Sequence, residues 1–154
     1  MYNLFSQAGF QVGLLSTVKV MIGQENFPAT HTTPDSISIN KYLAQMVDAG
    51  CQYCFMEVSS HGIAQKRTAA LDFDGGLFSN LSHDHLDYHK TFAEYRDVKK
   101  SFFDQLDKKA FAITNADDKN GEFMLQNCKA NKLSYGLKNV ADIHGQVLES
   151  QISG

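Results

Sequence analysis

The sequence predicts an α/β fold in which a mostly parallel sheet has helices on both faces. Short apolar runs typical of buried strands alternate along the chain with segments whose apolar residues recur at helical spacing. Strands and helices that alternate in this way form parallel sheets, because each helix crosses a face of the sheet to reach the next strand. With 154 residues, 43% of them hydrophobic, the chain can bury the core of one domain.

The first part of the chain predicts a helix, a strand and a second helix. Residues 2–8 have helical apolar spacing, and Gly9 can adopt the left-handed conformation that ends a helix. No capping residue precedes this helix, so we expect the chain to begin inside a longer one. Residues 11–22, rich in Val, Leu and Ile, predict one strand. Thr33 as N-cap and Pro34 as first helical residue then predict a helix.

A strand over residues 53–58 predicts a ligand-binding position at its end. The run is apolar except for Glu57, which places a carboxylate near the C-terminal end of a buried parallel strand. Open α/β sheets bind their ligands at this edge. Two structural alternatives are that Glu57 caps the next helix or pairs with Arg67. His61, beside a glycine, is interpreted as a loop residue.

The second half of the chain repeats the alternation of strands and helices. Polar and glycine-containing segments separate the periodic ones throughout. The predicted elements are a strand over 77–81 after a bend at Gly75 and Gly76, a helix over 90–106, a strand over 110–114, a helix ending near Cys128, and strands over 133–135 and 143–148.

Residues 83–89 hold the densest cluster of chemically active side chains. This stretch contains three of the six histidines and two aspartates, and it follows a predicted strand. Imidazoles and carboxylates at the C-terminal edge of a strand indicate a site for a metal or for a metal-bound phosphate.

One lysine lies within the apolar stripe of the helix over 90–106. Lys99 is near the centre of the stripe, whereas Lys100 lies at its edge and is expected to be solvated. A lysine in an apolar stripe is unfavourable unless it extends to solvent, pairs or is chemically altered. Two interpretations therefore remain: a lysine that extends along the helix edge, and one held to meet the cluster at 83–89.

Composition disfavours several partners and compartments. The net charge of −3, from 14 basic and 17 acidic residues, argues against nucleic acid or an anionic membrane as the main partner. No run reaches the roughly 20 apolar residues of a membrane span, and the N-terminus does not resemble a signal peptide. We therefore expect a cytoplasmic protein with no membrane insertion.

The cysteines fit the same compartment. The chain has three, an odd number that favours reduced thiols over a disulfide framework. Cys51 and Cys54 form a C-x-x-C pair, which leaves a redox or zinc role as an alternative. The pair leads into an apolar strand instead of opening a helix, and no second ligand pair follows, so this alternative is disfavoured.

Five motifs together resemble the central domain of the Mur ligases, most closely of the MurE type. They occur in the order and spacing of that family. The motifs are Met56-Glu-Val-Ser-Ser-His-Gly62, Gln65-x-Arg67, Ser79-Asn-Leu-Ser-x-Asp-His-Leu-Asp-Tyr-His89, Tyr95-x-x-x-Lys99 and Asn115-Ala-Asp-Asp118.

The resemblance implies a P-loop NTPase-like fold and an amide-forming reaction of peptidoglycan synthesis. Members use ATP and Mg²⁺ to phosphorylate the D-glutamate carboxylate of UDP-N-acetylmuramoyl-L-alanyl-D-glutamate. The amine of a diamino acid, meso-diaminopimelate or L-lysine, then displaces the phosphate. Cations near the γ-phosphate and the carboxylate offset the charge of the two reacting anions.

The resemblance also implies roles for individual residues. Glu57 matches a carboxylate that binds one Mg²⁺, His85 a histidine at the second, and Lys99 a lysine that becomes carbamylated and faces the metal. Asn115 matches an ATP contact near the adenine. The positions that match contacts to the UDP-sugar dipeptide are Thr32, Thr33, Ser59, Gln65 and Arg67.

Other features of the family do not occur in the sequence. The chain contains no G-x-x-x-x-G-K-[ST] phosphate loop, and the helix over 2–8 is where that loop would lead. Residues 1–154 thus match a partial central domain, without the N-terminal uridine-binding and C-terminal domains. We expect the chain alone to be inactive, and its bare sheet edges to favour self-association.

Two other functions remain open on the sequence alone. One is a metal-dependent phosphoesterase that uses Asp84, His85, Asp87 and His89 without further sequence. The other is a non-catalytic binding module that keeps the fold and some substrate contacts.

Overall fold

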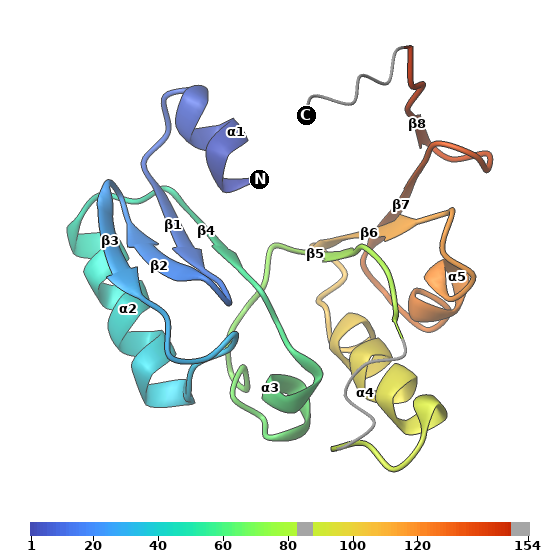
Figure 1. The fold of residues 1–154 in the computed structure, drawn as a ribbon, viewed down its shortest axis with the longest axis horizontal. Coiled ribbons are helices and arrows are strands. Elements are labelled where there is room, and N and C mark those ends of the chain that lie inside the picture. The colour runs from blue at the N-terminus through green and yellow to red at the C-terminus, as the bar shows by residue number, and fades with distance from the viewer. Residues whose placement is uncertain (83–87, 149–154) are drawn as a thin grey trace, which may run out of the picture. The chain divides into compact units, whose positions relative to one another are not determined.

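The computed structural model describes residues 1–82 and 88–148 and divides into two compact units, Met1–Ala70 and Leu71–Gly154 (Figure 1). We call them unit 1 and unit 2. Each contains a four-stranded sheet with helices packed against it, which confirms the predicted α/β class. Within the described ranges, no helix has the length and apolar character needed to cross a membrane.

Unit 1 contains a mixed sheet with strand order β3-β2-β1-β4. The elements are α1 (Tyr2–Gln7), β1 (Val12–Leu15), β2 (Lys19–Ile22), β3 (Glu25–Pro28), α2 (Ser36–Asp48), β4 (Tyr53–Met56) and α3 (Ser60–Ala64). β4 pairs with β1 in parallel, whereas β1, β2 and β3 form an antiparallel meander. The Glu57 strand is thus parallel to its neighbour, as predicted, but it is a partly exposed strand at the end of this sheet.

The prediction of one strand over residues 11–22 is wrong, because the segment folds back as a hairpin. Ser16 closes the turn between β1 and β2: its backbone N–H donates to the carbonyl of Lys19 at 3.1 Å, and its hydroxyl donates to the same oxygen at 2.8 Å. Leu15 consequently lies opposite Val20. The apolar run continues on both sides of the turn, so hydrophobicity alone did not reveal it.

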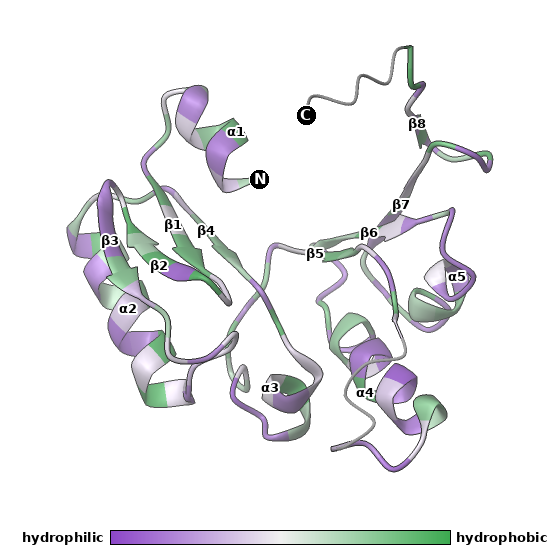
Figure 2. Ribbon diagram, in the orientation of Figure 1, coloured by the Kyte–Doolittle hydropathy of each residue, from purple (hydrophilic) through white to green (hydrophobic). Residues whose placement is uncertain are grey.

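Helices lie on both faces of the sheet in unit 1. Gly13 faces α2, where a Cβ atom would lie 2.2 Å from the sulfur of Met46. Tyr53 and Phe55 point to the other face, and their rings lie 4.9 and 5.1 Å from that of Phe5 in α1. Gly9, with φ +90°, follows α1 as predicted. Figure 2 shows hydrophobic residues along β1 and β4, and mixed hydropathy along α2, as expected of a helix with one buried face.

The predicted N-cap of α2 is also wrong. Asp35 caps the helix, accepting hydrogen bonds from the backbone N–H of Ser38 at 3.0 Å and from its hydroxyl at 2.7 Å. These bonds lower the pKa of the Asp35 carboxyl below its usual value. Thr33 instead binds groups at the end of β4, so tertiary contacts override its capping preference.

Unit 2 contains an all-parallel sheet whose strand order, β5-β6-β7-β8, follows the chain. The elements are β5 (Gly75–Phe78), α4 (Phe92–Asp104), β6 (Phe111–Asn115), α5 (Gly121–Met124), β7 (Asn131–Gly136) and β8 (Ile143–His144). Each strand is joined to the next by a right-handed crossover. Because every crossover moves in the same direction across the sheet, successive helices lie on the same face. Figure 1 accordingly shows α4 and α5 on one side of β5, β6 and β7.

The core of unit 2 lies between the sheet and these helices. Phe78, Ala112, Phe103 and Met124 are among its buried residues. Gly75 and Gly76 belong to β5 and form no bend, contrary to prediction. A Cβ atom at Gly76 would lie 2.8 Å from the ring of Phe102, so the glycine permits the close approach of α4. α5 is shorter than predicted and ends before Cys128.

Candidate active-site residues

Thr33 joins the loop before α2 to the C-terminal end of β4. Its hydroxyl donates to the carbonyl oxygen of Glu57 at 2.9 Å and accepts from the backbone N–H of Ser59 at 2.9 Å. Thr33 is fully buried, and a Cβ atom at Gly62 would lie 2.8 Å from the Thr33 Cβ. Ser59 caps α3, accepting from the backbone N–H of Gly62 at 3.1 Å. Two predicted substrate-binding residues, Thr33 and Ser59, are therefore in direct contact.

Glu57 is exposed and held by a residue that the sequence did not indicate. Its Oε2 atom accepts hydrogen bonds from the backbone N–H and the hydroxyl of Thr17, each at 2.7 Å. The hydroxyl of Thr32 lies 3.1 Å from that of Thr17. Neither structural alternative for Glu57 holds, because Ser59 caps α3 and Arg67 binds other groups. Within residues 1–82 and 88–148, the second carboxylate oxygen, Oε1, accepts no hydrogen bond.

Arg67 is fixed by two of the residues predicted to bind the same ligand. Its Nε and Nη2 atoms donate to Gln65 Oε1 at 2.9 and 2.6 Å, and Nη1 donates to the carbonyl of Thr33 at 2.6 Å. Lys66, between Gln65 and Arg67, has φ +54°, a left-handed conformation uncommon outside glycine. A guanidinium held in this way has a defined orientation for a ligand carboxylate or phosphate.

A pocket of about 310 Å³ opens beside this guanidinium. It is lined by His31, Asp35, Ser36, Gln65 and Arg67. The lining combines the Arg67 cation and the Asp35 carboxylate with hydroxyl, amide and imidazole groups. Such a surface suits a polar ligand, with the guanidinium placed for a negatively charged group of that ligand.

Lys99 lies on α4 and is half-buried, as the apolar stripe predicts. Burial lowers the pKa of its ammonium group from the usual 10.5. Nζ lies 5.8 Å from the centre of the Tyr95 ring, one helical turn earlier. Tyr95 stacks on His89, with ring centres 5.4 Å apart, and both rings are buried. The side chain of Lys99 thus has an aromatic neighbour that is itself fixed by packing.

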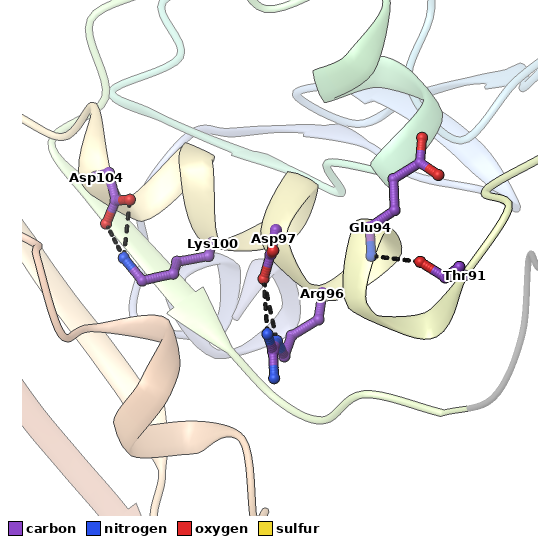
Figure 3. Close-up of polar contacts among 6 residues, drawn as sticks. All are labelled: Thr91, Glu94, Arg96, Asp97, Lys100 and Asp104. Carbon is purple, nitrogen blue, oxygen red and sulfur yellow. Dashed lines mark hydrogen bonds and ion pairs between the residues drawn. The ribbon is translucent and has the colours of Figure 1, made fainter.

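The prediction that Lys100 is solvated is wrong. Lys100 is only 6% exposed, and its Nζ donates to both carboxylate oxygens of Asp104, at 2.7 and 2.8 Å (Figure 3). Its Nζ also lies 5.7 Å from the centre of the Phe123 ring, and Arg96 lies over the same ring at 3.9 Å. Because Phe123 extends from α5, the second helix covers a side of α4 that the stripe alone assigns to solvent.

The turn after β6 is hydrogen-bonded to the segment that follows β5. Asn115 Nδ2 donates to the carbonyl of Ser79 at 2.8 Å, and its Oδ1 accepts from the backbone N–H of Asp117 at 2.9 Å. Asp118 Oδ2 accepts from the backbone N–H of Leu81 at 3.0 Å. Asn115, the predicted ATP contact, is therefore held in a fixed orientation at the C-terminal edge of the sheet.

The carboxylate of Asp117 binds the loop after β7. It accepts from the backbone N–H groups of Leu137, Lys138 and Asn139 at 2.7, 3.1 and 2.8 Å. These bonds hold the pKa of Asp117 below its usual 3.8. The sequence motif contained Asp117 and Asp118, but nothing in their spacing indicated which loops they bind.

Other predicted metal and phosphate residues fall outside the described part of the chain. These are His83, Asp84, His85 and Asp87. Among residues 1–82 and 88–148, no three His, Cys, Asp or Glu side chains lie close enough to hold a metal. The cysteine pair does not support a redox site. Cys54 is exposed as a residue, but desolvation of its thiol, and secondarily Cys51, raise its pKa to about 11, which disfavours the reactive thiolate.

A family model for the Mur ligase middle domain matches residues 1–154. The chain belongs to this family. It is 54% identical over all its 154 residues to UDP-N-acetylmuramoyl-L-alanyl-D-glutamate–2,6-diaminopimelate ligases of Parabacteroides distasonis, Phocaeicola vulgatus and Cytophaga hutchinsonii. The match covers 32% of each, so this Mur ligase middle domain spans about a third of the length of the curated relatives it matches.

A solved structure of a ligase with the same name also resembles this middle domain. The TM-score is 0.79 at 29% sequence identity, over 92% of this chain and 29% of the other. The recognition made from the five motifs is confirmed.

Proposed function

We propose that this Mur ligase middle domain works within an ATP-dependent ligase that joins a diamino acid to UDP-N-acetylmuramoyl-L-alanyl-D-glutamate in cytoplasmic peptidoglycan synthesis. The observation that carries the proposal is 54% identity over every residue of the chain to ligases named for this reaction. Residues 1–154 then form part of one central domain, and the rest of the active site comes from sequence beyond them. ATP phosphorylates the D-glutamate carboxylate, and the amino acid amine displaces inorganic phosphate.

The residues of unit 1 support binding of the UDP-sugar dipeptide. We assign Thr32, Thr33, Ser59, Gln65 and Arg67 to this ligand. The fixed Arg67 guanidinium beside the pocket provides a cation for one of its negative groups. Because Gln65 and Thr33 already orient the guanidinium, little ordering is required when the ligand binds.

The carboxylate of Glu57 fits Mg²⁺ as it stands, whereas Lys99 fits Mg²⁺ only after its amine has been carbamylated. Carboxylate oxygen is the ligand that Mg²⁺ prefers, and Oε1 of Glu57 is not engaged by the described residues. An ammonium group at Lys99 does not fit. Attack of the neutral amine on the carbon of CO₂, with loss of one proton, forms a carbamate whose oxygens do. Burial lowers the pKa of Lys99 and so favours the neutral amine.

We assign Glu57, His85 and carbamylated Lys99 to Mg²⁺ and to catalysis, with His85 outside the described residues. Bound Mg²⁺ offsets negative charge between the phosphate and carboxylate groups. Asn115, held by Ser79 and Asp117, presents its remaining amide hydrogen and lone pair for adenine. We also propose that the isolated chain self-associates and does not ligate.

A chimeric ligase tests the proposal. The matched third of the Parabacteroides distasonis ligase is replaced by these 154 residues, and ligation is measured with ATP, Mg²⁺, the UDP-sugar dipeptide and diaminopimelate. We expect activity in the chimera, none in the isolated chain, and loss of activity in the chimera on Lys99→Met or Glu57→Gln. An inactive but folded chimera would contradict the proposal.

Measurements on the isolated chain and on the chimera distinguish the other two functions. Phosphatase activity that depends on a divalent metal, and is lost on His89→Ala in the isolated chain, would favour the phosphoesterase. Binding of the UDP-sugar dipeptide by a chimera that folds but does not ligate would favour the binding module. Light scattering of the isolated chain tests self-association, which a monomer at all concentrations would exclude.

A further inference from the structure

Three side chains of unit 1 form a short chain of hydrogen bonds. Thr17 lies between the other two: its hydroxyl oxygen is 2.7 Å from Glu57 Oε2 and 3.1 Å from the hydroxyl oxygen of Thr32. Its backbone N–H also donates to Glu57 Oε2, at 2.7 Å. We assign Glu57 to Mg²⁺ and Thr32 to the UDP-sugar dipeptide, so these bonds connect residues with two different ligands. We call Thr32, Thr17 and Glu57 the hydroxyl chain.

The backbone holds each residue of the hydroxyl chain in place. The N–H of Glu57 donates to the carbonyl of Leu15 at 2.8 Å, and its carbonyl accepts from the Thr33 hydroxyl at 2.9 Å. Thr33 is fully buried and directly follows Thr32, and Thr17 lies in the hydrogen-bonded turn between β1 and β2. Thr17 and Glu57 are exposed, so water competes for their hydrogen bonds. The anchored backbone reduces the conformational entropy lost when these side chains pair.

The single proton of each hydroxyl gives the hydroxyl chain a direction. A carboxylate oxygen can only accept, so the short 2.7 Å contact requires Thr17 to donate its proton to Glu57. That proton is then not available for the 3.1 Å contact, in which Thr32 must donate to the Thr17 oxygen. Each hydroxyl thus donates toward the negative charge of the carboxylate. Hydrogen bonds aligned in this way polarise and strengthen one another.

We propose that Thr32 is a positioning residue for the Mg²⁺ carboxylate and acts on Glu57 through Thr17. The inference rests on the proposed function, which assigns Glu57 to Mg²⁺. Thr32 fixes the rotation of the Thr17 hydroxyl, because an oxygen that accepts from Thr32 directs its own O–H bond at Glu57. Two donors then hold Oε2, and the carboxylate presents Oε1 to the metal. A residue assigned to the UDP-sugar dipeptide thereby also supports the metal site.

Metal binding measured without the UDP-sugar dipeptide separates this role of Thr32 from substrate binding. The probe is Mn²⁺, whose electron paramagnetic resonance signal distinguishes bound from free metal, titrated into the chimeric ligase with a saturating non-hydrolysable ATP analogue. The variants are Thr32→Val, Thr17→Val and the double variant, with Thr32→Ser as the conservative replacement that keeps the hydroxyl. Thr30→Val is the matched control, because the hydroxyl of this exposed threonine, in the same loop, contacts His31 instead.

We expect Thr32→Val to lower the Mn²⁺ affinity roughly two- to threefold, less than the loss of about fivefold in Thr17→Val, because Thr32 strengthens only one of the bonds to the carboxylate. The double variant should bind like Thr17→Val alone, since Thr32 acts only through Thr17. Thr32→Ser and Thr30→Val should bind like the parent. An unchanged affinity in Thr32→Val would overturn the proposal, and so would effects of the two valine replacements that multiply in the double variant.

The isolated chain provides a second readout that needs no metal. The backbone N–H of Thr17 donates to Glu57, so the hydrogen exchange of this amide, followed by NMR, measures how firmly the carboxylate is held. Thr32→Val should accelerate this exchange about twofold or more, whereas Thr30→Val should not. Unchanged exchange would refute the hydroxyl chain itself. An active chimera whose Thr32→Val variant binds Mn²⁺ like the parent refutes this inference alone, and an inactive, folded chimera with the expected Mn²⁺ affinities refutes the proposed function alone.

Discussion

Glu57 accepts two hydrogen bonds from Thr17, one from its backbone N–H and one from its hydroxyl, each 2.7 Å long. The bonds connect the turn between β1 and β2 to the end of β4, 40 residues later in the sequence. They engage one carboxylate oxygen and leave the other available to a ligand. Thr17 therefore sets the position of the carboxylate that we assign to Mg²⁺.

We expect Thr17→Val to weaken the binding of Mg²⁺ by the chimeric ligase. Valine has the shape of threonine but cannot donate, so Glu57 keeps the backbone bond and loses the other. A hydrogen bond of about 1 kcal/mol corresponds to about a fivefold higher Mg²⁺ concentration at half-maximal activity. Thr17→Ser retains both donors and should behave as the parent. An unchanged Mg²⁺ dependence in the valine variant would mean that the hydroxyl does not position Glu57.

Arg67→Lys should weaken binding of the UDP-sugar dipeptide more than it slows turnover. Lysine cannot donate to Gln65 and Thr33 from one rigid plane, so the cation loses its defined orientation. We expect KM for this substrate to rise about tenfold, a loss of about 1.4 kcal/mol, with a smaller change in kcat. Arg96→Lys on α4 is the control and should leave KM unchanged. A fall in kcat alone would place Arg67 in the chemical step instead.

Asp104→Ala should destabilise the isolated chain by about 2 kcal/mol, because it leaves the buried Lys100 cation without its partner. Lys100→Met should cost less, since the Asp104 side chain is 33% exposed and can be hydrated. Urea unfolding gives both values. Asp97→Ala removes the carboxylate that pairs with Arg96 (Figure 3). This pair is more exposed than the pair of Lys100 and Asp104, so the free energy of unfolding should change by less than about 1 kcal/mol. Equal effects at positions 97 and 104 would contradict the distinction between the two pairs.

Asp117 should contribute stability that is lost in acid. Its pKa is lowered by the backbone N–H groups of Leu137, Asn139 and Lys138, so its stabilisation is complete above the usual value of 3.8 and disappears as the pH falls through the lowered pKa. Asp117→Asn should therefore flatten the decrease in unfolding free energy below about pH 4. Asp72→Asn, at an exposed position, measures the general effect of removing one negative charge. If the unfolding free energy decreases as steeply with falling pH in the Asp117 variant as in the Asp72 control, the assignment to Asp117 is wrong.

Local patterns predicted the type of most elements, but not the contacts that link distant segments. The helix α4 and the strands β4 to β7 followed from periodicity and apolar runs. The β1–β2 turn did not, because the run through it remains apolar and Ser16 closes it without glycine or proline. Thr33 looked like a helix cap on local grounds, yet Glu57 and Ser59 engage its hydroxyl.

The residues of the candidate site show the same contrast between local patterns, which indicated some of them, and distant contacts, which fix the others. Glu57 and Lys99 were indicated by their positions, one at a strand end and the other in an apolar stripe. Thr17 could not be found, since its partner lies 40 residues away. Lys100 was misjudged because a single helix pattern contains no information about Phe123, which approaches from α5. Predictions from one element fail where a second element decides the surroundings.

The strand order of unit 2 has a consequence for how the chain folds during synthesis. Each strand from β6 onward pairs with the strand made just before it, so this half can assemble in the order in which it leaves the ribosome. In unit 1, β4 pairs with β1, and β2, β3 and α2 are made between them. Val12 pairs with Tyr53 and Gly75 with Phe111, so the first parallel pairing in each unit closes a loop of similar length. The antiparallel meander β1–β2–β3 needs only short turns. It should therefore acquire its native hydrogen bonds before the parallel pairs of either unit.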